Sequence, residues 1–159
     1  MSWRERSWHS ASGDLIPSDD VAEKIQSKVS TGSRIFIGCD SNVIGTTCTY
    51  AIAIALYNDT LKGGGRYFFS RERVQIPFQT PLRTRLMEEA NLAIMLGLEL
   101  QDDFPDAKIE IHLDVSPHKS NLSSTMADQL AGYAQAAGFD CKIKPHSWAA
   151  SGVADEHTR

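Results

Sequence analysis

The sequence has few cysteines, no excess of positive charge and no long hydrophobic run. Its cysteines, Cys39, Cys48 and Cys141, are odd in number and form no Cys-x-x-Cys pair, so we expect no disulfide framework and a reducing, cytoplasmic location. The first residues carry charges with no apolar stretch behind them, so we expect no secretory signal. The longest uncharged stretch, residues 41–58, is apolar only over residues 51–57, whereas a membrane helix needs roughly 20 apolar residues. We therefore expect no membrane partner and predict a buried strand there.

The overall composition is that of one globular domain with a sizeable core. The chain has 159 residues, of which 42% are hydrophobic and 23% are charged. Sixteen basic and 20 acidic side chains give a net charge of −4, which excludes a strongly basic, nonspecific nucleic-acid coat. The balance is compatible with a nucleic-acid enzyme, because a bound metal neutralises the carboxylates that hold it. The sequence leaves the oligomeric state open.

The N-terminal third predicts an arm, a helix and the start of a sheet. Residues 1–16 are polar and irregular, and we expect a flexible arm that Trp3 and Trp8 attach to the body. Residues 17–159 are predicted to form a single domain, which opens with a helix at about residues 17–31 because apolar side chains recur there at helical spacing.

Three strands connected by short loops follow and predict an antiparallel meander. They are expected at residues 34–40, 48–57 and 66–74. The second strand alternates large and small side chains, with Tyr50, Ile52, Ile54 and Leu56 on one face and Ala51, Ala53 and Ala55 on the other.

The rest of the chain alternates helices and strands. The pattern predicts a helix over residues 82–100, a strand over 109–114, a helix from Ser123 or Ser124 to Ala137, a strand over 139–144 and a helix over 149–157. Such a succession requires parallel strands joined by right-handed crossovers. The predicted fold is therefore α/β, with a mixed five-stranded sheet flanked by helices.

Four acidic residues lie at predicted strand ends or in predicted helices, where they are candidates for a functional site. Asp40 and Asp114 close predicted strands, and the carboxyl ends of strands in an open α/β sheet are where ligands bind. Glu89 lies on the apolar stripe of its helix, where a carboxylate is costly unless it is paired or binds a metal, whereas Glu88 points away from the stripe. Asp155 lies in the last helix. The alternatives are a turn role for Asp40 and an ion pair between Glu89 and Arg85.

Converging carboxylates repel one another and therefore indicate a cation. Oxygen ligands favour Mg²⁺ or Mn²⁺, and two such ions about 4 Å apart support phosphodiester hydrolysis, one activating water and the other stabilising the leaving oxygen. His112 and Asp114 make a zinc site a further alternative, although no H-x-x-x-H or H-E-x-x-H motif is present.

An ordered set of short stretches resembles the YkuK-type family of the RNase H-like superfamily. The resemblance spans residues 33–159 and rests on residues 38–41, 82–85 with Glu89, 112–114, 138–139, 144–145 and 149–155. It implies an RNase H-like fold in which Asp40 bridges both metals. It also implies that Glu89 and Asp114 hold one ion and Asp155 the other, with Glu88 replacing Glu89 if the helix register differs by one residue.

Other side chains are candidates for supporting roles. His112, Ser41 and His157 are predicted to surround the carboxylates, His112 by orienting a carboxylate and His157 by protonating the leaving group. Basic residues that could contact a nucleic-acid backbone are Arg71, Arg73, Arg85, Lys142 and Lys144. An ordinary solvated surface is the alternative for them.

The sequence thus predicts a metal-dependent nuclease that hydrolyses phosphodiester bonds with two Mg²⁺ or Mn²⁺ ions. Its expected partner is nucleic acid, as an RNA–DNA hybrid, RNA or structured DNA. Two alternatives stay open: a non-catalytic RNase H-like module that binds nucleic acid or protein, and a metal hydrolase of small phosphorylated molecules.

Overall fold

The structure, a computed structural model, describes residues 1–58, 65–116 and 124–159. In this part of the chain, seven strands form one mixed sheet in the order β2-β1-β5-β4-β3-β6-β7. The strands are β1 (Trp8–Ser10), β2 (Leu15–Ile16), β3 (Arg34–Ile44), β4 (Thr47–Tyr57), β5 (Arg66–Gln75), β6 (Ile109–Leu113) and β7 (Asp140–Lys142). The helices are η1 (Trp3–Glu5), α1 (Ser18–Ser30), α2 (Leu82–Asp103), α3 (Ser124–Ala136), η2 (Ala149–Ala154) and η3 (Asp155–His157).

The five strands predicted from the sequence form the body of the sheet. β3, β4 and β5 pair antiparallel as a meander, and β6 and β7 add to β3 in parallel. The predicted mixed arrangement is therefore confirmed. β6 is a central strand because it pairs with β3 on one side and with β7 on the other. α3 begins at Ser124 in the described chain, and the alternative start at Ser123 lies outside it.

Residues 1–16 form regular structure where the sequence predicts an irregular arm. η1 is followed by β1 and β2, and β1 pairs with the edge of β5 through His9 and Ser10. Trp3 and Trp8 are buried, as their predicted anchoring role requires, and the Trp8 indole N–H donates to the Trp3 carbonyl at 2.7 Å. Strands of three and two residues carry too little periodicity to be recognised in a sequence.

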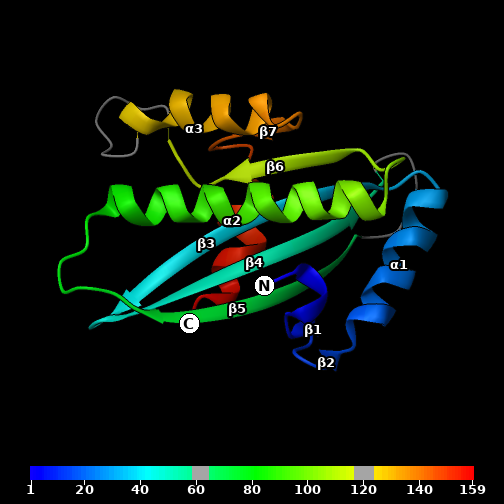
Figure 1. Ribbon diagram of the computed structural model, residues 1–159, viewed down its shortest axis with the longest axis horizontal. Coiled ribbons are helices and arrows are strands. Elements are labelled where there is room, and N and C mark those ends of the chain that lie inside the picture. Colours follow the sequence, from blue (N-terminus) through cyan, green and yellow to red (C-terminus); the bar gives the residue numbers. More distant parts are fainter. Residues whose placement is uncertain (59–64, 117–123) are drawn as a thin grey trace.

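The sheet separates two layers of unlike size (Figure 1). α2 crosses one face and covers the main hydrophobic core, which includes Ile37, Ile52 and Ile54. η2 and η3, drawn in red, lie on the opposite face, where they meet small side chains such as Ala51 and Ala53. Among the described residues, no helix combines the length and apolar character needed to cross a membrane.

The last predicted helix differs in kind from the expectation. Residues 149–154 form a π-helix, and residues 155–157 form a turn of 3₁₀-helix. The segment lies directly on β3 at Gly38, because a Cβ atom built there would collide with the Ala149 carbonyl and the Ala150 nitrogen. The absence of a side chain at Gly38 lets two backbones come into contact, which is one of the main structural uses of glycine.

Candidate metal centre

Asp40 lies in β3 on the face that carries η2 and η3. Its pairing partner across β4 is Ala51, and Ala51 pairs in turn with Arg71 of β5, so the three side chains share one row of this face. The Asp40 side chain is buried, with the whole residue 7% exposed. Cys39 pairs with Leu113, the last residue of β6, so Asp114 follows directly beside Asp40.

Glu89 reaches the same region from α2. Leu86, Glu89 and Ala93 share the buried stripe of the helix, and Glu89 is 5% exposed. The Ser41 hydroxyl donates to Glu89 Oε2 at 2.5 Å, and Arg85 Nη1 donates to the Ser41 oxygen at 3.1 Å. Arg85 therefore acts on Glu89 through Ser41, where the sequence allowed a direct ion pair. Glu88 is exposed, so the helix register is the one that turns Glu89 inward.

Asp114 is the first residue after β6 and is half-buried. Lys144 Nζ lies 3.0 Å from its Oδ1, although the angle does not allow a hydrogen bond between these atoms. The two charges are thus paired without a directional bond. Lys144, predicted to contact nucleic acid, neutralises an acid of the site in this arrangement.

Asp155 is carried by the segment that docks on Gly38. It is exposed, and its carboxyl group is near enough to that of Asp40 to raise the pKa of Asp40. Two residues later, the His157 ring stacks on Phe69 with centroids 3.6 Å apart, and its Nε2 is 3.0 Å from the Tyr67 hydroxyl. Arg71 Nε donates to the His157 carbonyl at 2.7 Å. These contacts fasten η3 to β5 and so place Asp155 over β3.

His112 fastens the other end of the same segment. It is fully buried, and its Nδ1 accepts a hydrogen bond from the Ala149 N–H at 3.0 Å. The proton of the neutral ring is therefore on Nε2, which lies 2.6 Å from Glu110 Oε2 and donates to it. Burial lowers the pKa of His112, against the opposing effect of Glu110, and so favours this neutral form. In these contacts His112 orients η2 and not one of the site carboxylates.

The site carboxylates raise one another's proton affinity. Burial raises the pKa of Asp40 to about 9, and the neighbouring carboxyl group of Asp155 adds to the shift. The negative charges of Glu89 and Asp114 raise it further. Burial also raises the pKa of Glu89 to about 8, even though the hydrogen bond from Ser41 favours the charged form. The local cations therefore do not balance the negative charge of this region.

The donor set fits a hard divalent cation. All four acids offer oxygen, the ligand type that Mg²⁺ and Mn²⁺ prefer, and two of them are buried at a cost that a cation would offset. Within the described ranges, however, no three His, Cys, Asp or Glu side chains stand in an arrangement that holds a metal ion. The structure brings the acids into electrostatic contact without closing them into a coordination shell.

The predicted basic residues divide between two regions. Arg71 and Arg73 lie on β5, exposed, on the face that bears Asp40; Arg73 extends the row formed by Asn42 and Thr49. Lys142 lies on β7, the other edge of the sheet, and is exposed. The positively charged residues therefore flank the carboxylates from both sides along the strand order.

Sequence reasoning did not predict which residues hold the last segment. Gly38, Tyr67 and Phe69 carry no charge and belong to no catalytic pattern, yet they determine where Asp155 lies. The available signal was the run of alanines on one face of β4, which indicates a close-packed partner.

The chain matches a family model described as Ribonuclease H-like over residues 18–159. No curated protein and no solved structure matches it.

Proposed function

This chain belongs to the Ribonuclease H-like family, as the resemblance to YkuK-type members predicted, and on this premise we propose that it is a metal-dependent nuclease. The proposed reaction is hydrolysis of phosphodiester bonds at a site made of Asp40, Glu89, Asp114 and Asp155. The observation that carries the proposal is the burial of Asp40 and Glu89, which come from different elements and end beside two further acids.

Buried carboxylates in a group are expensive unless a cation accompanies them. Arg85 makes its hydrogen bond to Ser41 and not to Glu89, Lys144 is paired with Asp114, and the attraction of both cations leaves the pKa of Glu89 raised. Burial is the main cause of the raised pKa values of Asp40 and Glu89, and the neighbouring acids raise both values further. Stability alone offers no reason to keep the acids there, because neutral side chains of the same size would pack at lower cost.

We assign Asp40, Glu89, Asp114 and Asp155 as the metal-holding residues. Two Mg²⁺ or Mn²⁺ ions held by these residues would supply Lewis-acid activation of water and stabilisation of the leaving oxygen. The protein's own contribution is to hold the carboxylates at fixed positions. Ser41 and Arg85 orient Glu89, and η2 and η3 bring Asp155 to β3.

The substrate class that fits is a nucleic acid. Arg71 and Arg73 are exposed on the face that bears Asp40 and are suited to phosphate contacts. The candidates are an RNA–DNA hybrid, RNA and structured DNA. The three cysteines are free thiols in the structure, which suits activity in a reducing cytoplasm.

The test is a cleavage panel in Mg²⁺ and in Mn²⁺, with EDTA as the blank. The substrates are labelled RNA–DNA hybrid, single-stranded RNA, single-stranded DNA, duplex DNA and a four-way junction. The protein is compared with Asp40→Asn and with Asp128→Asn, a matched control because Asp128 is exposed on α3. We expect metal-dependent cleavage of at least one substrate by the wild type and by Asp128→Asn, and loss by a factor of about 10³ or more in Asp40→Asn.

Equal cleavage by Asp40→Asn contradicts the proposal, because it shows that another site or a contaminant acts. Binding of a substrate without cleavage in either metal favours the non-catalytic module. If the protein neither binds nor cleaves any of these nucleic acids, the result favours a small phosphorylated substrate.

A further inference from the structure

A pocket in the described surface lies apart from the carboxylates. It lies at the other end of β3 and has a volume of about 570 Å³, within the size range of small-molecule sites. Its residues include none of the four acids. Phe36 and Asp40 lie on the same face, four residues apart, which places the pocket roughly 13 Å from the metal centre along the strand.

The sheet itself creates the hollow. Phe36, Ala55 and Tyr67 are paired in one row across β3, β4 and β5, so a methyl group stands between two aromatic rings. The small central side chain leaves space above β4 that large neighbours would have filled. Val153 of η2 and Trp148 close the pocket from the side of the last segment.

Aromatic rings with free surface line this space. Tyr57 is 42% exposed and Trp148 is 39% exposed, and their ring centroids are 6.4 Å apart at 71°. The Trp148 ring also packs against two buried rings, with centroid distances of 4.9 Å to Phe36 and 5.2 Å to His112. A planar ring entering the pocket therefore meets a fixed indole and a more exposed phenol.

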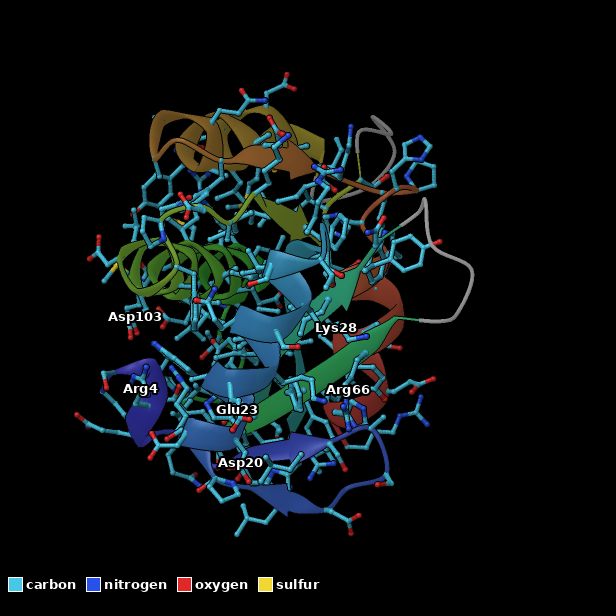
Figure 2. The ribbon with its side chains drawn as sticks, turned by 90° about the vertical axis from the view of Figure 1, so that its right-hand side faces the viewer. Arg4, Asp20, Glu23, Lys28, Arg66 and Asp103 are labelled. Carbon is cyan, nitrogen blue, oxygen red and sulfur yellow. The ribbon has the colours of Figure 1, made fainter. Side chains whose placement is uncertain are left out.

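The charge of the lining is positive. Arg34 and Arg66 both line the pocket, and the described lining contains no acidic residue. Arg34 is partly offset by Glu110 and Asp140, at 3.2 and 3.8 Å, and its side chain remains 39% exposed. Arg66, labelled in Figure 2, is exposed and is paired with no carboxylate in the described part of the chain. Its guanidinium lies 5.9 Å from the centroid of the Phe68 ring, at the edge of the pocket.

We propose that this pocket binds a nucleotide, with the base against Tyr57 and Trp148 and the phosphate near Arg34 and Arg66. Aromatic faces accept any base, and guanidinium groups are the preferred partners of phosphate. The nucleotide is either a free nucleoside phosphate or one residue of a bound strand. The inference is independent of the nuclease proposal, since the pocket shares no residue with the carboxylate site.

The experiment is isothermal titration in EDTA with the four nucleoside 5′-monophosphates and with a short single-stranded oligonucleotide. Adenosine serves as the phosphate-free probe and ribose 5-phosphate as the base-free probe. We expect saturable binding of a monophosphate or of the oligonucleotide, and weaker binding of both reduced probes. Binding of the monophosphate as tight as that of the oligonucleotide identifies a free nucleotide, and binding of the oligonucleotide alone identifies a strand residue.

Two pairs of variants locate the binding. Tyr57→Ala should weaken it by at least roughly fivefold, whereas Tyr133→Ala, which removes an equally exposed tyrosine from α3, should not. Arg66→Gln should weaken it by about fivefold or more and reduce its salt dependence, whereas Arg83→Gln on α2 should not. If Tyr57→Ala fails to fold, the comparison of Arg66→Gln with Arg83→Gln still tests the proposed nucleotide site.

The proposal is overturned if neither nucleotide probe binds the wild type, or if Tyr57→Ala and Arg66→Gln bind as tightly as their controls. Nucleotide binding by Asp40→Asn distinguishes a failure of this proposal from a failure of the nuclease proposal. This variant should bind the nucleotide like the wild type, and equal loss of binding in Asp40→Asn shows that the ligand occupies the carboxylate site instead.

Discussion

The two faces of the central strands differ in the size of their side chains, and the difference separates stability from function. On the face toward α2, β4 presents Ile52, Ile54 and Leu56, all essentially inaccessible to solvent. On the opposite face it presents Ala51, Ala53 and Ala55. The large side chains bury more apolar area, and we expect that layer to supply most of the folding free energy.

The large side chains bury apolar area, whereas the small side chains let another segment of backbone lie close to the sheet. Gly38 and the alanines let the backbone of η2 lie on the sheet, and this segment brings Asp155 to Asp40. The same face leaves the pocket above Ala55 open. One face therefore buries most of the apolar area, and the other buries less and bears the pocket and Asp40 of the proposed metal site.

The largest expected effect lies on the α2 face. Ile52→Ala should lower the free energy of unfolding by about 2–5 kcal/mol, because it leaves a cavity in a close-packed core. Ala53→Gly, one residue away on the other face, should cost only about 1 kcal/mol, the usual penalty for glycine in a strand. Urea unfolding of both variants measures the contrast, and equal losses would remove the basis of the comparison.

Metal should stabilise the folded protein through the four acids, which come from both sides of the sheet. At about 100 times the dissociation constant, Mg²⁺ or Mn²⁺ should raise the free energy of unfolding by roughly 2.7 kcal/mol, by mass action on the folded state. Asp40→Asn should lose this gain, and without metal it should be about 1 kcal/mol more stable than the wild type at neutral pH, because folding no longer has to protonate a buried acid that is ionised in the unfolded chain.

Thermal unfolding with and without metal measures both effects, and Asp128→Asn serves as the control. A metal response that persists in Asp40→Asn would place the cation elsewhere.

Gly38→Ala tests the backbone contact itself. The new Cβ meets the Ala149 carbonyl and the Ala150 nitrogen, so the segment must move, at a cost of about 2 kcal/mol. Cleavage should fall by a larger factor than this stability loss explains, because Asp155 is displaced from Asp40. Gly132→Ala in α3, where no neighbour lies within 4 Å of the new atom, should instead be neutral or stabilising by about 0.5–1 kcal/mol.

The smallest expected change concerns the aromatic anchor. His157→Ala should cost about 1 kcal/mol, because it removes the stack on Phe69 and the hydrogen bond with Tyr67. It should also reduce cleavage by loosening Asp155. His157→Phe keeps the stack and should restore most of the activity.

A positioning role therefore predicts rescue by phenylalanine. A proton-donating role, which the sequence suggested for His157, predicts that His157→Ala and His157→Phe are equally impaired. His146→Ala, at an exposed position, is the matched control.

The body of the fold could be predicted because its signals are local. The alternation in residues 48–57 and the apolar stripe through Glu89 follow from the periods of strand and helix. The inward orientation of Glu89 needed only the correct helix register. The short strands at residues 8–10 and 15–16 could not be predicted, because they exist through pairing with β5 and not through their own pattern.

The details of the site depend on contacts between distant residues. Ser41 lies between Arg85 and Glu89 only once α2 has packed on β3. The pairing of Lys144 with Asp114 depends on the parallel course of β7 beside β6. The sequence identifies the ionisable groups, whereas the contacts that balance their charges follow from the tertiary arrangement.

The last segment contributes to both proposed sites. Trp148 and Val153 form a wall of the pocket, and Asp155 follows within the same docked stretch. Two ligands that contact one segment are thermodynamically linked to the extent that each favours one position of that segment. A nucleotide that prefers the docked position would therefore tighten cation binding at Asp155, and the cation would tighten nucleotide binding by the same factor.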